Sequence, residues 1–313
     1  MNDSPLISVV IPTRNAFGAT AATLRALFDQ TLPPAVLMEV VVVDDASTDN
    51  SADQLAGEFG PRIMLIRQAR NEGRSATRNR GAQAASGQWL ALLDCDCLPS
   101  PGYLDAMLTA LIPTAVCVGT VRYMPNGFWA HYQEMGARRR LDAHRHGEPG
   151  ALSTACMAMD RRAFLAIGGY DEGYRHYGFE DRDLLLRLQA AGLATRHVEH
   201  ACVEHADQVD LRTLMKKNME AAQYTAPRFH AAHPEVFRRS GYARIDASLH
   251  PWMARLGALS GAAALWLTAP LARLLECRAI PLRMRIFMAR CLLASAYCLG
   301  SLKARQNSTR ASE

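Results

Sequence analysis

Two carboxylates one residue apart, Asp94 and Asp96, are the side chains whose types and spacing best fit a chemical role. They follow the apolar run Trp89 to Leu93, which has the length and composition of a buried strand. In open α/β sheets, ligands gather at the carboxyl ends of strands. Mg2+ and Mn2+ prefer oxygen ligands and commonly take one or two carboxylates together with substrate phosphates. The pattern therefore predicts a divalent cation site, although Asp-x-Asp pairs are also common in solvated turns.

The elements that would position these carboxylates alternate between short apolar runs and helical patterns. Strands are expected at 7–11, 40–43, 63–66 and 89–93, and helices at 19–30, up to 58 and 75–85. This alternation is typical of βαβ units and a parallel sheet. Pro12 is expected to stop the first strand, and Ser47, Thr48 and Asp49 to cap the second helix. The polar residues after the four strands should then meet at one edge of the sheet.

Length and composition are those of a globular protein. The chain has 313 residues, of which 49% are hydrophobic and 21% charged, enough for one large domain or two smaller ones. Its eight cysteines follow no paired framework, which favours a reduced, cytoplasmic interior. The N-terminus has no basic region before an apolar stretch, so we expect no secretory signal.

The formal net charge of +5 is concentrated at the C-terminal end. From Arg273 onward the chain has eight basic residues and only Glu276 and Glu313 as acidic ones, so the rest is close to neutral. Nucleic-acid binding would require basic residues interleaved with aromatic ones along a face, and no such stripe is seen. We therefore expect no nucleic-acid partner.

Several short motifs follow one another in a fixed order. They are PTRN at 12–15, VDDASTD at 43–49, NEG at 71–73, ATRNRG at 76–81, DCD at 94–96, GGYDE at 168–172 and GFEDRDL at 178–184. Each motif alone is weak, but the ordered set is strong. Over roughly residues 5–210 the chain resembles the family-2 nucleotide-sugar glycosyltransferases, which have the GT-A fold.

The resemblance implies an α/β fold with a Rossmann-like, mostly parallel sheet flanked by helices. Residues 1–210 would form the GT-A domain, with a donor half at about 1–100 and an acceptor half at about 101–210. Residues 211–313 would form a helical C-terminal extension, possible membrane-associating in character.

For the nucleotide, the resemblance implies that Pro12, Thr13 and Arg14 border the base. It also implies that Asp44 or Asp45 reads the imide or ribose edge, and the sequence does not choose between the two. A carboxylate only accepts hydrogen bonds, so it suits a uracil or thymine N–H or a ribose hydroxyl. Alternatively, both carboxylates only cap the helix that follows.

For the diphosphate, the resemblance places Arg78, Asn71 and Asp94 in the donor site. A planar guanidinium binds phosphate in a bidentate manner, which suits Arg78. Arg74 and Arg80 are expected to be solvated charges of the same helix, although their crowding around Arg78 favours an anionic ligand.

The acidic pair Glu180 and Asp181 is expected to open a helix whose buried face carries Leu184, Leu185 and Leu188. Carboxylates in a first turn are stabilised by the helix dipole, which suits a base before it takes a proton. By resemblance Asp181 is the catalytic base, and Glu180 binds an acceptor hydroxyl. The alternative is ordinary acidity at a helix start, with Asp183 and Arg187 forming a surface pair.

The implied cofactor is Mn2+ or Mg2+, held by Asp94, Asp96 and His205. His200 and His205 are expected to follow a strand, and by resemblance His205 is the better metal ligand, since imidazole completes a Mn2+ shell. A lone histidine in a strand is more often structural.

The C-terminal extension contains two apolar stretches, Leu256 to Ala272 and Ile286 to Leu302. Both are short of the roughly 20 residues that a spanning helix needs, and Pro270 and Arg290 interrupt them. Arginines between and around them favour two helices lying on an anionic inner leaflet. A packed or oligomerising helical pair and a spanning hairpin are the alternatives.

Taken together, the resemblance implies a metal-dependent, inverting glycosyltransferase, hexosyltransferase-like, that uses a UDP-sugar or a related donor. The acceptor would be a glycan or lipid-linked hydroxyl in cell-surface polysaccharide, lipopolysaccharide or glycolipid synthesis, at the cytoplasmic face of the cell membrane. No QxxRW motif is present, so we expect single additions. One alternative is a catalytically silent nucleotide-sugar-binding scaffold. Another is a sugar nucleotidyltransferase, which would want a glycine-rich loop where 12–15 stands.

Overall fold

A computed structural model describes residues 7–33, 36–124, 127–206 and 209–312. The contacts divide the chain into two compact units, which we describe separately. Unit 1 comprises Met1–Met124, Glu134–Arg175 and Asp181–Asp207, and unit 2 comprises Pro125–Gln133, His176–Glu180 and Gln208–Glu313. Such units are defined by contacts alone, so the predicted domain boundary after residue 210 stays a prediction.

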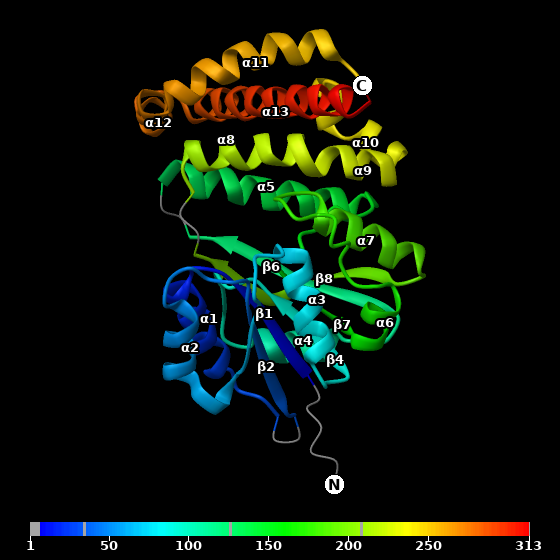
Figure 1. Ribbon diagram of the computed structural model, residues 1–313. Coiled ribbons are helices and arrows are strands. Elements are labelled where there is room, and N and C mark those ends of the chain that lie inside the picture. Colours follow the sequence, from blue (N-terminus) through cyan, green and yellow to red (C-terminus); the bar gives the residue numbers. More distant parts are fainter. Residues whose placement is uncertain (1–6, 34–35, 125–126, 207–208, 313) are drawn as a thin grey trace. The chain divides into compact units, whose positions relative to one another are not determined.

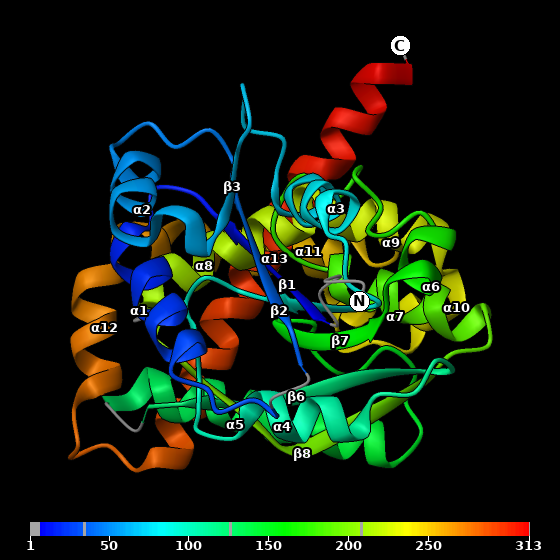
Figure 2. The same cartoon turned by 90° about the horizontal axis from the view of Figure 1, so that it is seen from below.

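Within its described residues, unit 1 is built on an eight-stranded sheet of order β3-β2-β1-β4-β7-β6-β8-β5 (Figures 1 and 2). The strands are β1 (Ile7–Thr13), β2 (Met38–Asp44), β3 (Met64–Arg67), β4 (Trp89–Leu93), β5 (Cys97–Pro99), β6 (Ala115–Tyr123), β7 (Cys156–Asp160) and β8 (Ala194–His205). β1 to β4 pair in parallel, as do β6 and β8, whereas β7 and β5 pair antiparallel to their neighbours. The predicted α/β fold with a mostly parallel sheet flanked by helices is confirmed.

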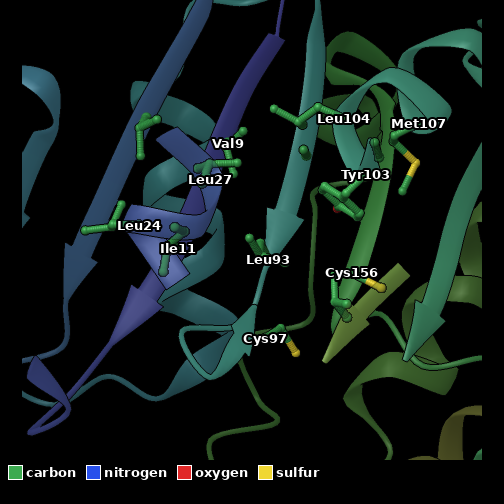
Figure 3. Packing of buried hydrophobic residues seen from close by; sticks show 14 of the residues in the cluster. Val9, Ile11, Leu24, Leu27, Leu93, Cys97, Tyr103, Leu104, Met107 and Cys156 are labelled. Atoms are coloured by element: carbon green, nitrogen blue, oxygen red, sulfur yellow. The ribbon is translucent and has the colours of Figure 1, made fainter. Parts of the chain in front are cut away.

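The central strands are buried on both faces, which explains their nearly continuous apolar sequences. One face packs against α1 (Phe17–Phe28), α2 (Ser51–Phe59) and α4 (Tyr103–Ala110). Figure 3 shows this layer, where Val9 and Ile11 of β1 meet Leu24 and Leu27 of α1. The other face packs against α3 (Arg74–Ala84), α6 (Arg161–Ala166) and α7 (Glu180–Ala190).

Two predicted boundaries are wrong. β1 does not stop at Pro12 but continues to Thr13, because pairing with β2 extends to Thr13 whereas pairing with β4 ends at Val10. Proline is tolerated where a strand is paired on one side only. The second helix begins at Ser51 after Asn50, so Ser47 and Thr48 do not cap it. Of the three predicted caps, only Asp49 contacts its first turn, by accepting the Ser51 N–H at 3.0 Å.

Three further features differ from the expected elements. The helix α5 (Gly127–Arg145) and the short strand β5 have no predicted counterpart. His200 and His205 lie within β8 rather than after a strand. The apolar stretch Leu256 to Ala272 is divided between two helices, α11 (Pro251–Trp266) and α12 (Thr268–Glu276), which meet at an angle of 87°. The break falls at Leu267, three residues before Pro270.

Unit 2 is helical in its described part. After α8 (Leu211–Glu220) come a π-helical turn (Ala221–Thr225), α9 (Ala226–Ala232), α10 (Pro234–Arg239), a 3-10 turn (Gly241–Ile245), α11, α12 and α13 (Leu282–Ser312). α13 packs between α8 and α11 (Figure 1). Judged by length and composition, the stretch Leu282–Asn307 is long and apolar enough to cross a membrane, and α11 with α12 would pass only as one bent span.

Candidate active site

The end of β4 lies beside the residues that precede β7. Leu93 pairs with Cys156, and beyond that pair the Asp94 N–H donates to the Ala155 carbonyl oxygen at 2.9 Å. This bond brings the segment 153–155 next to Asp94. The antiparallel pairing of β4 and β7 therefore places the Asp-x-Asp carboxylates near a segment far away in sequence.

Arg78, on α3, contacts the first of these carboxylates directly. Its Nη2 lies 2.5 Å from Asp94 Oδ1, and the exposed fractions of the two side chains are 4% and 25%. The Arg78 guanidinium carbon also lies 5.1 Å from the centre of the Tyr170 ring. Arg78 thus balances the charge of Asp94, and its predicted contact with a donor diphosphate stays a prediction.

The Tyr170 ring is fixed by its own backbone. Asn79, next to Arg78 on α3, donates to the Tyr170 carbonyl at 2.9 Å and accepts the Tyr170 N–H at 2.8 Å. Gly169 is required here, because a Cβ at that position would lie 2.4 Å from Asn79 Oδ1. Burial raises the pKa of Tyr170, although nearby Arg78 opposes the shift. The Tyr170 hydroxyl therefore keeps its proton at neutral pH.

Asp181 accepts hydrogen bonds from two consecutive residues. Ser153 Oγ and the Thr154 N–H each donate to Oδ2 at 3.1 Å, and Thr154 Oγ1 donates to Oδ1. The Thr154 hydroxyl also lies 2.7 Å from the Tyr170 hydroxyl. Since Thr154 gives its one proton to the carboxylate, Tyr170 must donate to Thr154. The order of donors is therefore Tyr170, Thr154, Asp181.

A second group of possible ligands forms where β5 pairs with β8. Cys97 lies opposite His205, and the ligand atoms of Asp96, Cys97 and His205 all lie within 4.8 Å of one another. His205 Nε2 is 3.8 Å from Asp96 Oδ2, and its ring stacks on Tyr123 at 5.2 Å between centres.

This group fits a divalent cation. A carboxylate and an imidazole are suitable ligands for Mn2+, and His205 is held in place by its strand and by Tyr123. Burial, and next the nearby Asp94, raise the pKa of the Cys97 thiol, so a protonated and weakly coordinating sulfur faces the site at neutral pH. Asp94 is not in this group of the described residues, and its role as a metal ligand stays a prediction.

Asp44 and Asp45, at the end of β2, are both buried and bonded to the chain. Asp44 accepts the Ser47 N–H at 3.1 Å and the Ser47 hydroxyl proton. Asp45 accepts from Glu72 N at 2.7 Å, Gly73 N at 3.1 Å and Gln68 Nε2 at 3.0 Å. Neither caps α2, which begins only at Ser51. Asp45 instead ties the end of β2 to the loop before α3.

The remaining predicted donor residues line the loops after β1 and β3. Thr13 is buried, and its hydroxyl lies 2.7 Å from that of Thr20, whereas Arg14 is exposed and Pro12 half-buried. Asn71 is exposed, and its side chain accepts the Gly73 N–H at 3.0 Å. The sheet gathers the ends of β1, β2 and β4 at one edge, as expected, and the roles of these residues stay predictions.

The acidic pair at the start of α7 is placed as predicted. Glu180 begins the helix and is buried, and Leu184, Leu185 and Leu188 are fully buried. Asp183 and Arg187 form the expected pair at 2.8 Å, but Asp183 is buried, so this is not a surface pair. The catalytic roles of Asp181 and Glu180 stay predictions.

Ser153, Thr154 and Asn79 were not singled out from the sequence as site residues. Asn79 and Tyr170 lie inside quoted motifs, which was the available signal. Nothing in the segment LSTAC around Thr154 indicates a contact with a carboxylate 27 positions away. That contact depends on the pairing of β4 with β7, which sequence periodicity does not reveal.

Residues 8–168 match the model of "Glycosyl transferase family 2", and residues 144–210 match that of the "N-terminal domain of galactosyltransferase". Validoxylamine A glucosyltransferase of Streptomyces hygroscopicus is 32% identical over 60% of this chain and 49% of its own length. Pre-mycofactocin glycosyltransferase of Mycobacterium tuberculosis is 27% identical over 73% of this chain and 48% of its own. The chain thus spans about half the length of these relatives.

Among solved structures, mannosyltransferase PcManGT of Pyrobaculum calidifontis, in complex with GDP-Man and Mn2+, is similar in fold. The TM-score is 0.65 at 21% identity, over 98% of this chain and 88% of that one. GalNAc-T7 with UDP, GalNAc and Mn2+ gives a TM-score of 0.53 at 20% identity, over 75% of this chain and 52% of that one. At such identities the likeness concerns the GT-A-like fold.

Proposed function

This chain belongs to glycosyl transferase family 2, and on that premise we propose that it transfers a sugar from a nucleotide-sugar donor to a hydroxyl acceptor. The observation that carries the proposal is a continuous chain of contacts. It runs from Asp94 through Arg78, Tyr170 and Thr154 to Asp181. A candidate donor-site carboxylate and a candidate base are thereby linked across one sheet edge.

In the proposed reaction Asp181 is the base. Its carboxylate accepts the proton of the acceptor hydroxyl while that oxygen attacks the anomeric carbon and the bond to the nucleoside diphosphate breaks. A single displacement of this kind inverts the anomeric configuration. Ser153 and Thr154 orient the carboxylate, and Tyr170 supplies the donor that keeps the Thr154 proton directed at Asp181. Geometry of this kind lowers the entropic barrier to attack.

Asp96 and His205 are the residues that would hold Mn2+ or Mg2+, with Asp94 beside them. When bound, such a cation neutralises negative charge that develops on a leaving diphosphate. Arg78 contributes positive charge at the same edge. The buried carboxylates of Asp44 and Asp45, which only accept hydrogen bonds, favour a base with an N–H edge, so a UDP-sugar is the proposed donor.

The proposed acceptor is a glycan or lipid-linked hydroxyl, in the synthesis of cell-surface polysaccharide, lipopolysaccharide or glycolipid. The proposed location is the cytoplasmic face of the cell membrane. What supports it is the basic C-terminal end, which an anionic inner leaflet would attract.

Donor binding tests the proposal most simply. Thermal unfolding is followed with UDP-, dTDP- and GDP-sugars, each with and without Mn2+. A donor that binds the folded state raises the melting temperature, by about 2.7 kcal/mol of stabilisation at a hundredfold excess over Kd. We expect one donor class to do so in the presence of Mn2+, and Asp96→Ala to abolish the shift. No shift with any nucleotide sugar would contradict the proposed function.

A further inference from the structure

The helix α11 has its large and small side chains on unexpected sides. The residues that it buries are small, namely Ala254, Ala258, Gly261 and Ala264. The large apolar ones face outward, with exposed fractions of 64% for Trp252, 64% for Leu256, 74% for Leu259 and 91% for Trp266. A helix on the surface of a water-soluble domain normally buries its large apolar residues.

The small residues allow α11 to approach α13 closely. A Cβ at Gly257 would lie 2.6 Å from Cys298 Sγ, and one at Gly261 would lie 2.5 Å from the Ser295 carbonyl oxygen. Between these glycines, Ser260 Oγ lies 2.9 Å from Ser295 Oγ, a hydrogen bond between the two helices. Close contact through small residues, supported by serine hydrogen bonds, is typical of helices that pack in lipid.

Charge is distributed around this face in a distinct way. From Leu256 to Ala272 the sequence contains no charged residue. The flanking arginines Arg255, Arg273, Arg278, Arg283 and Arg290 are all exposed. Between residues 251 and 306 Glu276 is the one acidic residue. An uncharged, aromatic-rich face bordered by cations suits a surface that is apolar within and anionic at its boundary.

We infer that the outward face of α11 is a membrane-contact surface that lies in the interfacial layer of an anionic bilayer. Trp252, Leu256, Leu259 and Trp266 enter the acyl boundary, and the arginines bind lipid phosphates. The inference rests on the proposed location at the membrane and is independent of the proposed transfer chemistry.

Two other occupants are disfavoured by the same observations. A second copy of this chain, paired about a twofold axis, would bring identical basic surfaces together. A transmembrane course is disfavoured because α11 has 16 residues, whereas spanning needs about 20, and the bend of 87° to α12 follows at once. A helix lying in the plane of the interface needs neither extra length nor a straight continuation.

The test is flotation of the full chain with vesicles of phosphatidylcholine alone or mixed with phosphatidylglycerol, without nucleotide sugar. We expect binding to the anionic vesicles, and about tenfold or more weaker binding for Leu259→Glu. Ile112→Glu, at an exposed apolar position of unit 1, is the matched control and should bind like the wild type. Lipids brominated in the acyl chain should quench the tryptophan fluorescence, and Trp266→Phe should lose part of that quenching.

Absence of flotation with anionic vesicles, or equal binding by Leu259→Glu, would overturn the inference. A lipid-free dimer of the wild type that Leu259→Glu dissociates would also overturn it, in favour of a second copy. If the protein floats but no nucleotide sugar raises its melting temperature, the membrane surface stands and the proposed transfer fails. The opposite pair of results refutes the surface and leaves the transfer intact.

Discussion

Nη2 of Arg78 lies 2.5 Å from Oδ1 of Asp94, and the arginine side chain is almost entirely buried. A buried guanidinium is tolerated only when a counter-charge and other contacts compensate for its lost hydration. Asp94 supplies the charge, and the Tyr170 ring provides a face for the cation. Arg78 therefore supports both the fold around the site and the position of the Asp94 carboxylate.

Arg78→Met should lower the free energy of unfolding by about 3 kcal/mol, because it leaves the Asp94 carboxylate without its main counter-charge. Arg80→Met, at an exposed position on the same helix, should change it by less than about 0.5 kcal/mol. Urea unfolding of both variants measures the difference. Equal stability of the two would show that the pair contributes nothing measurable.

Thr154→Val removes the hydroxyl that donates to Asp181 and accepts from Tyr170. If Asp181 is the base, kcat should fall about a hundredfold, since a displaced base loses its productive alignment. The KM for the donor should stay close to that of the wild type, and Thr154→Ser should restore most of kcat. A serine variant as slow as the valine variant would instead indicate that the methyl group, through packing, determines the effect.

The buried thiols should resist alkylation. Burial raises the pKa of Cys95 to about 12, and it also raises the pKa of Cys97 and Cys156, so few thiolates are present near neutral pH. Cys277 and Cys291 are exposed. Iodoacetamide treatment of the native protein, followed by mass spectrometry, should modify these two first. Rapid modification of Cys97 would contradict the closed packing between β5 and β8.

Stability should fall in acid through His197. Its pKa is lowered by burial and by nearby Arg145, so below the ordinary value of 6.5 the unfolded chain binds the proton more readily. This contribution is complete above pH 6.5 and is lost as the pH falls below it. His197→Gln should therefore show a smaller drop in melting temperature between about pH 7.5 and about pH 5.5. His200→Gln, exposed on the same strand, should behave like the wild type.

Sequence periodicity predicted β1 to β4 and α7 well, because each has a strong apolar pattern bounded by polar residues. It failed for β5 and α5. β5 is three residues long and exists through its pairing with β8, so no local pattern marks it. The polar sequence of α5, with three consecutive arginines, hides its few buried residues, Phe128 and Trp129.

The candidate site could be predicted residue by residue only where a motif was present. Asp94, Asp96, Asp181 and His205 come from motifs or their neighbourhood, and the sheet brings Asp96 and His205 together through β5 and β8. The residues that hold them in place, Thr154 above all, act through long-range strand pairing. Such contacts depend on register between distant segments, which a single sequence does not specify.

The central claim is that Asp181 receives the acceptor proton, and transfer by Asp181→Asn tests it most directly. Amide and carboxylate have the same size, so the variant should bind donor and Mn2+ like the wild type in thermal unfolding. Asp183→Asn, on the same helix and paired with Arg187, is the control for structural damage. The account predicts that sugar transfer is lost in Asp181→Asn and retained in Asp183→Asn. Transfer at the wild-type rate by Asp181→Asn would contradict it.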